Sequence, residues 1–353
     1  MWHCITNPQT PSSPNPPTRY DEALTYCLDE LGMTQFFFPR VGGDWDSNLY
    51  FLWHSPTVKK QKWLGVQIFD DELSLTPKFK QAFGNYVRQM TAHLKSKGWL
   101  DKVVLTTMDE PHSQDDLKAV HAFASFVKNI VPEVRIFCTT APRPELYGVI
   151  DVWCAQHYDA VEAKARQQQG EEFMFYKNWM NLIDMPMVNP RLNGWIAWRD
   201  GAVSWLTYSA MINEWHSWER PYTVYYPTTG IIAWGLGLMW YPGLMQSEIL
   251  KSVRWEMMRE GAEDYEYLTL LAKRLNELPK NLQNLPKVAQ ARSFLAAVTN
   301  DILLSPQFSA DPKERTKRGS WKKKPNFTTS NRTVWERRNE TAKWIQAIRT
   351  SSK

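Results

Sequence analysis

The sequence predicts an α/β fold, specifically a (β/α)8 TIM-type barrel with a helical C-terminal extension. Short apolar runs alternate with amphipathic helical stretches, which is typical of parallel βα units. The number of apolar runs approaches eight, and a chain of 353 residues is long enough for such a domain. A doubly wound open sheet is the alternative. Its nucleotide-binding version is disfavoured because no glycine-rich phosphate-binding motif follows an early apolar run.

The predicted strands are short segments rich in β-branched and aromatic residues. Seven of them are 34–40, 64–69, 102–108, 134–140, 151–156, 172–177 and 202–208, and an eighth is 2–6. Helical patterns separate them at 21–31, 77–97, 114–130 and 161–168. In the second of these helices, Phe79, Phe83 and Leu94 recur at helical spacing, and Gly98 is placed to cap its C-terminus.

The C-terminal part of the sequence differs in composition from the barrel. A Trp-rich segment at 209–246 precedes predicted helices at 247–277 and 281–304. Residues 306–353 contain 13 Lys or Arg and 4 Asp or Glu, a net charge of +9, so the remaining chain carries −4 of the total +5. This composition predicts a basic, largely disordered tail, with a final helix at 332–349 as the alternative. The predicted domains are thus a barrel at 1–278, a helical extension at 279–305 and a tail at 306–353.

Several classes of protein are excluded by composition. The mildly acidic body offers no basic surface for nucleic acid. Cysteines occur at Cys4, Cys27, Cys138 and Cys154. Their spacing fits neither a zinc site nor a disulfide framework, so we expect free, buried thiols. No signal peptide is visible, and the charge-free stretch 221–247 contains too short an apolar part to cross a bilayer. The sequence therefore predicts a soluble protein without a membrane span.

The stretch "VVLTTMDEPHS", residues 103–113, contains the first candidate catalytic residues. A predicted buried strand ends at Asp109 and Glu110, and chemistry in a barrel occurs at the carboxyl ends of the strands. Two adjacent carboxylates repel each other, which is useful where one must keep its proton while the other stays ionised. The alternative is a plain strand-to-helix turn, in which Ser113 and Asp116 cap the following helix.

A second segment, "SVRWEMMREGAEDYEYLTLL" at 252–271, decides between these interpretations when it is combined with Asp109-Glu110-Pro111. Over about residues 20–277 the chain resembles the catalytic barrel of glycoside hydrolase family 123, the β-N-acetylgalactosaminidases. The other matching residues are Gly201, Trp205, Tyr241, Pro242, Gly243, Ser252, Arg254, Glu256, Arg259, Gly261, Glu263, Asp264, Tyr265 and Glu266.

The resemblance implies a retaining exo-glycosidase that releases terminal β-linked N-acetylgalactosamine, or a close 2-acetamido sugar, from a glycan or glycolipid. The acetamido oxygen of the substrate would be the nucleophile and form an oxazoline intermediate. Glu110 would be the general acid, and Asp109 would stay ionised and stabilise the acetamide. An ordinary retaining enzyme needs a second carboxylate as nucleophile, and no acid follows the strand 172–177 before Asp184. The resemblance implies no metal or organic cofactor and suits a secreted or periplasmic enzyme.

Other candidate site residues follow predicted strands or lie in the matching motifs. Tyr176 and Trp205 are placed to shape a sugar pocket, with a core position as the alternative. His157 is a candidate hydroxyl ligand, and Tyr241 precedes a turn at Pro242-Gly243. The charged side chains of the helix 252–271 are predicted to form salt bridges between the helix and the barrel. The family's loop carboxylate is replaced by Leu236, which favours the alternative function of a degenerate barrel that binds carbohydrate without cleaving it.

Overall fold

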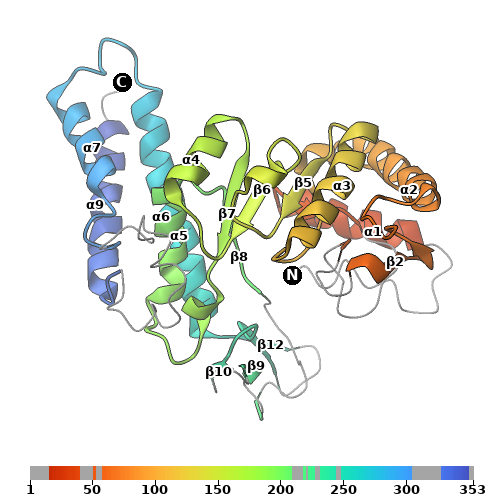
Figure 1. Cartoon of the computed structure of the whole chain (residues 1–353). Coiled ribbons are helices and arrows are strands. Elements are labelled where there is room, and N and C mark those ends of the chain that lie inside the picture. Colours follow the sequence, from red (N-terminus) through yellow and green to blue (C-terminus); the bar gives the residue numbers. More distant parts are fainter. Residues whose placement is uncertain are drawn as a thin grey trace. The chain divides into compact units, whose positions relative to one another are not determined.

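We describe a computed structural model of the chain (Figure 1). The structure describes residues 16–39, 51–52, 58–208, 218–219, 222–226, 231–243, 248–303 and 327–349. The chain divides into two compact units. Unit 1 comprises Met1–Tyr158 with Ala165–Phe173, and unit 2 comprises Asp159–Lys164 with Met174–Lys353.

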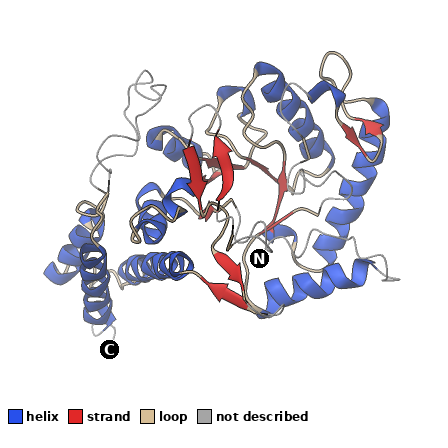
Figure 2. Cartoon of the chain, turned by 90° about the horizontal axis from the view of Figure 1, so that it is seen from below, coloured by secondary structure: helices blue, strands red, loops and turns tan. Residues whose placement is uncertain are grey.

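The main sheet has six strands in the order β1-β4-β5-β6-β7-β8, so each strand follows its neighbour along the chain. The strands are β1 (Phe36–Phe37), β4 (Val103–Thr106), β5 (Arg135–Cys138), β6 (Val152–Ala155), β7 (Glu172–Tyr176) and β8 (Ser204–Leu206). The pairings of β1 with β4, β4 with β5, β5 with β6 and β7 with β8 are parallel. The strands are short beside the helices (Figure 2). This is the α/β architecture that the alternating pattern predicts.

The complete eight-stranded barrel is not seen in the described residues. The predicted strand 64–69 forms a hairpin instead, in which β2 (Lys62–Trp63) pairs antiparallel with β3 (Val66–Gln67). Leu64 and Gly65 connect the two strands with φ of 49° and 81°. Positive φ at both positions is typical of a type I′ turn, which folds the segment back on itself and leaves it outside the main sheet. The predicted strand 2–6 lies outside the described residues.

Two long helices of unit 1 confirm the predictions from periodicity. Helix α2 (Pro77–Ser96) begins at Thr76, whose hydroxyl accepts the backbone N–H of Phe79. Helix α3 (Gln114–Ile130) follows β4. Phe79, Phe83 and Phe123 form an aromatic cluster between the two helices, with ring centroids of Phe83 and Phe123 5.2 Å apart. Helix α1 (Pro16–Leu24) also belongs to this unit and continues into a π-helical segment at Thr25–Glu30.

In unit 2, helices α5 (Asn189–Asp200) and α6 (Val253–Asn276) approach at two glycines. A Cβ atom added to Gly194 would lie 1.9 Å from the carbonyl oxygen of Gly261, and one added to Gly261 would lie 2.3 Å from that of Arg191. Only glycine fits at such a contact. Gly261 of the motif at 252–271 is thus explained by helix packing.

Part of the predicted tail is helical, which confirms the alternative of a final helix at 332–349. Helix α9 (Asn331–Arg349) packs against α6 and α7 (Pro286–Ala297), as Figures 1 and 2 show. Ile345 and Ile348 of α9 join Leu271 and Leu275 of α6 in one buried cluster. Removing α9 would expose this cluster, so we expect truncation before α9 to lower the stability of the protein. The rest of the predicted tail, at 304–326 and 350–353, lies outside the described residues.

The remaining elements are short. Helix α4 (Ala160–Gln168) lies between β6 and β7 in the chain, and two hairpins pair β9 (Tyr222–Tyr226) with β10 (Ile231–Trp234) and β11 (Trp240–Pro242) with β12 (Ile249–Lys251). Cys27, Cys138 and Cys154 are free and buried as predicted, and Cys4 lies outside the described residues. None of the helices in the described part of the chain combines the length and the apolar character that crossing a bilayer requires.

Candidate active site

Asp109 and Glu110 emerge from the buried sheet at the carboxyl end of β4. The backbone remains paired up to this point. The N–H of Thr107 donates to the carbonyl of Phe137 (3.0 Å), and the carbonyl of Thr107 accepts the N–H of Leu52 (2.9 Å). Residues 103–108 are all buried, whereas Asp109 and Glu110 are half-buried. The two carboxylates therefore lie where the strand leaves the core, as the sequence predicts.

Thr139 holds both residues in place from the end of the neighbouring strand β5. Its hydroxyl donates to Oδ1 of Asp109 (2.8 Å) and accepts the backbone N–H of Glu110 (2.9 Å). Glu110 has a φ of 44°, a left-handed conformation that is unfavourable for a residue with a side chain. Such strain persists only where the surroundings impose it, and it is concentrated at functional sites. The bonds to Thr139 therefore form a built support for the carboxylate pair.

The alternative, a plain turn into the next helix, explains only the residues that follow. Ser113 accepts the backbone N–H of Asp116 (3.0 Å), and the Asp116 carboxylate accepts the N–H of Ser113 (2.9 Å) and that of His112 (3.1 Å). This is a complete capping box for α3. Since the cap uses Ser113 and Asp116, it does not account for Asp109 or Glu110.

The side chain of Glu110 is accessible to a substrate. It is 42% exposed, and its Oε2 atom lies 3.9 Å from Nε2 of His112. The buried thiols of Cys138 and Cys154 lie close enough to Asp109 to be affected by its charge. Burial raises the pKa of Cys138 to about 12 and that of Cys154 well above its usual value, and the charge of Asp109 adds to both shifts. Both thiols therefore stay protonated at neutral pH, which makes them poor nucleophiles.

Comparison with known proteins shows what kind of domain carries this pair. Residues 37–271 match the family model for glycoside hydrolase 123, catalytic domain. The chain belongs to glycoside hydrolase family 123. The match includes Asp109, Glu110 and the helix 252–271, so the resemblance stated from the sequence is confirmed.

The family 123 chain is also similar to a solved structure, a family 123 glycoside hydrolase from Clostridium perfringens that was analysed for glycolipid glycan hydrolysis. The identity is 15% and the TM-score 0.47, and the similarity covers 77% of this chain and 45% of that one. The chain thus spans less than half of the length of this relative. A search of curated proteins gives no match.

The other predicted site residues are divided between the two units. His157 lies in unit 1, exposed and just past β6. Tyr176 is the last residue of β7 and is buried, and Trp205 is half-buried in β8. Tyr241 lies in β11, where its hydroxyl accepts a hydrogen bond from Arg254 (3.0 Å). The structure brings Asp109 and Glu110 together with Thr139, and the roles of the other four in sugar binding stay predictions.

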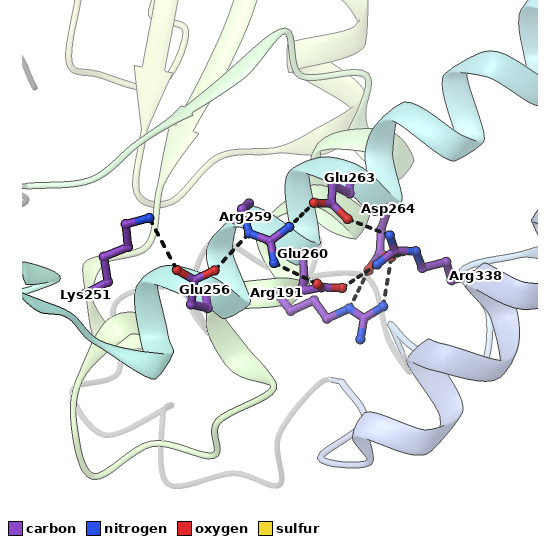
Figure 3. A network of polar contacts seen from close by, with 8 residues as sticks. All are labelled: Arg191, Lys251, Glu256, Arg259, Glu260, Glu263, Asp264 and Arg338. Atoms are coloured by element: carbon purple, nitrogen blue, oxygen red, sulfur yellow. Dashed lines mark hydrogen bonds and ion pairs between the residues drawn. The ribbon is translucent and has the colours of Figure 1, made fainter.

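The charged residues of the motif at 252–271 are structural (Figure 3). Asp264 accepts hydrogen bonds from Arg191 of α5 (2.6 and 2.9 Å) and from Nε1 of Trp195 (2.8 Å). Glu260 and Glu263 bind Arg338 of α9. The predicted salt bridge to another part of the domain is seen for Asp264, which binds Arg191 of α5. Arg259 instead pairs with glutamates of α6 itself, and Glu263 also binds Arg338 of the C-terminal helix α9.

Arg254 differs from the other charged residues of the motif. It donates to the backbone carbonyls of Asn181 (2.6 Å), Gly235 (2.9 Å) and Leu238 (2.5 Å). The hydrogen bonds of this buried guanidinium are therefore accepted by backbone carbonyls and not by a carboxylate. Leu236, which replaces the family's loop carboxylate, is itself buried between the glycines of this loop.

Thr139 and Lys177 are the residues that sequence reasoning missed. The signal for Thr139 was a hydroxyl at the carboxyl end of the strand beside β4. Lys177 follows β7 and is buried, and burial lowers its pKa from 10.5 to about 7, with Asp200 acting to raise it and Arg199 to lower it. A buried cation of this kind destabilises the folded state wherever the unfolded chain holds the proton more tightly.

We therefore expect Lys177→Met to stabilise the protein and to flatten its stability profile between about pH 7 and 10.5. In the wild-type protein, the unfolded chain binds the proton below 10.5 and the folded chain only below about 7, so stability should be lost as the pH falls through this window. Urea unfolding of both proteins across this range measures the difference. Parallel profiles would show that Lys177 titrates normally.

Proposed function

We propose that the chain is a retaining exo-glycosidase that releases terminal β-linked N-acetylgalactosamine, or a close 2-acetamido sugar, through an oxazoline intermediate. The observation that carries the proposal is the Asp109–Glu110 pair, held by Thr139 at the carboxyl end of β4 within a family 123 catalytic domain. Its substrates would be glycans or glycolipids, in keeping with the glycolipid glycan hydrolysis studied in the Clostridium perfringens relative.

In the first step, Glu110 donates its proton to the glycosidic oxygen as the bond from that oxygen to the anomeric carbon breaks. The acetamido carbonyl oxygen of the substrate forms the new bond to the anomeric carbon, which gives the protonated oxazoline (oxazolinium), whose N–H stays hydrogen-bonded to Asp109. In the second step, Glu110 takes a proton from a water molecule that attacks the anomeric carbon and opens the five-membered ring formed in the first step. The configuration is inverted twice and is therefore retained. The exposure of Glu110 suits a group that must reach a leaving oxygen.

Asp109 would accept the acetamide N–H and stabilise the positive charge that develops on this group. Its Oδ1 atom is bound to Thr139, and no other hydrogen bond to its carboxylate occurs within the described part of the chain. Asp109 is thus fixed by one oxygen while the other can face the substrate. Because Asp109 and Glu110 are consecutive residues, Thr139 supports both of them. The acetamido group of the substrate would take the place of a nucleophilic side chain.

Thr139 acts as a positioning residue in this proposal. Thr139→Val removes the hydroxyl at nearly constant volume, so Asp109 loses a hydrogen bond and the strained backbone of Glu110 loses its anchor. We expect kcat to fall about tenfold or more while KM changes little, because the lost orientation matters mainly in the transition state. Thr139→Ser keeps the hydroxyl and should retain most of the activity. Equal losses in both variants would show that Thr139 serves packing alone.

Turnover of a chromogenic aryl β-N-acetylgalactosaminide tests the proposed activity. NMR can monitor which anomer of the released sugar appears first. Initial release of the β-anomer would support a retaining enzyme. Binding of N-acetylgalactosamine without any hydrolysis would support the alternative of a degenerate barrel, which the buried Leu236 favours. The eight-stranded barrel and a catalytic domain at 1–278 stay part of the proposal, because several segments of this region lie outside the described residues.

A further inference from the structure

Trp218 presents a fixed and accessible aromatic ring in unit 2. Its side chain is 61% exposed, although its ring nitrogen Nε1 donates to the backbone carbonyl of Pro242 (2.8 Å). The ring also packs on Tyr241, with centroids 4.6 Å apart and planes inclined by 35°. One ring face is therefore covered by Tyr241 and the single donor is used, so the ring can meet a ligand only through its other face.

Tyr241, which supports Trp218, is itself held by hydrogen bonds. Tyr241 lies in β11, and its hydroxyl accepts a hydrogen bond from Nη2 of Arg254 (3.0 Å). The guanidinium of Arg254 is in turn buried and bound by three backbone carbonyls, as described above. An aromatic ring that is held in this way loses little conformational entropy when a ligand binds. Such pre-organisation is not needed for a surface residue without a ligand.

A carboxylate lies on the hairpin of β11 and β12 that supports this ring. Gly243 donates its N–H to the carbonyl of Glu248 (2.9 Å), and a Cβ atom added to Gly243 would lie 2.4 Å from Oε2 of Glu248. The Glu248 carboxylate therefore lies over Gly243, one residue from the carbonyl that holds Trp218. Glu248 is exposed, and Lys251 on the same hairpin is exposed as well. An apolar ring face held by a hairpin that also carries exposed charged groups fits a ligand that has both a C–H face and hydroxyl groups.

We infer that Trp218, supported by Tyr241 on the hairpin that also carries Glu248, forms a carbohydrate-binding platform that stacks on the C–H face of a pyranose ring. Glu248 would accept hydrogen bonds from hydroxyl groups of the same sugar. Tryptophan suits this role because it offers a large flat apolar surface at low entropic cost. A lipid or an apolar protein surface fits less well, because the carboxylate of Glu248 would be buried without a partner. The inference rests on family membership and on this geometry, and it does not depend on the Asp109–Glu110 chemistry.

The test measures binding of a short β-linked galacto-oligosaccharide to the full chain by titration calorimetry and saturation-transfer NMR. This probe carries no 2-acetamido group, so the proposed reaction cannot consume it. Trp218→Ala should weaken its binding about tenfold, in line with the loss of one stacked ring. Glu248→Gln should weaken it less. Trp335→Ala is the matched control, since Trp335 on α9 is 58% exposed and should not contribute.

Melting temperatures of the variants show whether they fold. Trp218→Phe provides a second variant that retains a ring but lacks the bond to Pro242, and it should bind with intermediate affinity. Unchanged affinity in folded Trp218→Ala, or an equal loss in Trp335→Ala, would overturn the inference. Because the readout is binding, a chain without hydrolytic activity could still confirm the platform, and an active enzyme could still refute it.

Discussion

Glu110→Gln is expected to lower kcat on an aryl β-N-acetylgalactosaminide by a factor on the order of 10² or more, because the variant has no proton to donate to the leaving oxygen. Glutamine has nearly the same size, and the backbone N–H of residue 110 can still bind Thr139. The melting temperature should therefore stay close to that of the wild-type protein. Steady-state kinetics and thermal unfolding measured on the same preparation separate catalysis from folding.

The effect should depend on the leaving group. A substrate with a very acidic phenol needs little protonation when the bond breaks, so it should lose less turnover in Glu110→Gln than a substrate with an alkyl leaving group. Glu145→Gln is a suitable control, since Glu145 is an exposed glutamate in the turn Pro144–Leu146 after β5. A fully active Glu110→Gln enzyme would show that another group is the general acid.

Asp264→Ala is expected to lower the free energy of unfolding by about 3–5 kcal/mol, the range for breaking a buried ion pair. The Asp264 side chain is fully buried, and its partner Arg191 is only 5% exposed. The variant would leave the guanidinium of Arg191 and the ring N–H of Trp195 without their acceptor. Urea unfolding measures the loss. It should occur without a specific loss of kcat in the folded fraction, because Asp264 connects helices and does not act on the substrate.

Glu256→Ala provides the comparison at the exposed end of the same network (Figure 3). Glu256 binds Arg259 (2.9 Å) on the surface of α6, where water screens the charges, so the variant should cost less than about 1 kcal/mol. The double variant Arg191→Met with Asp264→Leu removes both charges and should recover much of the stability. Similar losses for Asp264→Ala and Glu256→Ala would show that the buried pair is not a major source of stability.

Features that depend on neighbouring residues in the chain could be predicted from the sequence. Two carboxylates after a buried run predicted the end of β4, and the periodicity of the apolar residues predicted α2 and α3. Asp264 could be assigned to a salt bridge, although not to Arg191, because the partner is 73 residues away along the chain. Thr139 was missed for the same reason, since its bond to Asp109 exists only once β4 and β5 are paired.

The remaining misses arise from local features that composition conceals. Leu64 is an unusual residue for a positive φ, so the turn at Leu64 and Gly65 and the strand β3 that follows it were predicted as one strand at 64–69. Helix α9 is rich in charge, which suggested disorder, yet Val334, Thr341, Ile345 and Ile348 line one buried face. Their helical spacing was present in the sequence, and it outweighs mean hydropathy because a helix needs only one apolar face to pack.

The most direct test of the central claim compares two aryl β-galactosides that differ only at C2, one with an acetamido group and one with a hydroxyl group. If the acetamido oxygen is the nucleophile and Asp109 orients it, the first substrate should be hydrolysed with retention and the second should show no turnover above background. Asp109→Asn should lower kcat for the first substrate, because the charge that it stabilises exists chiefly in the transition state. Efficient hydrolysis of the plain galactoside, or a glycosyl ester trapped on Asp109, would contradict substrate-assisted catalysis by the Asp109–Glu110 pair.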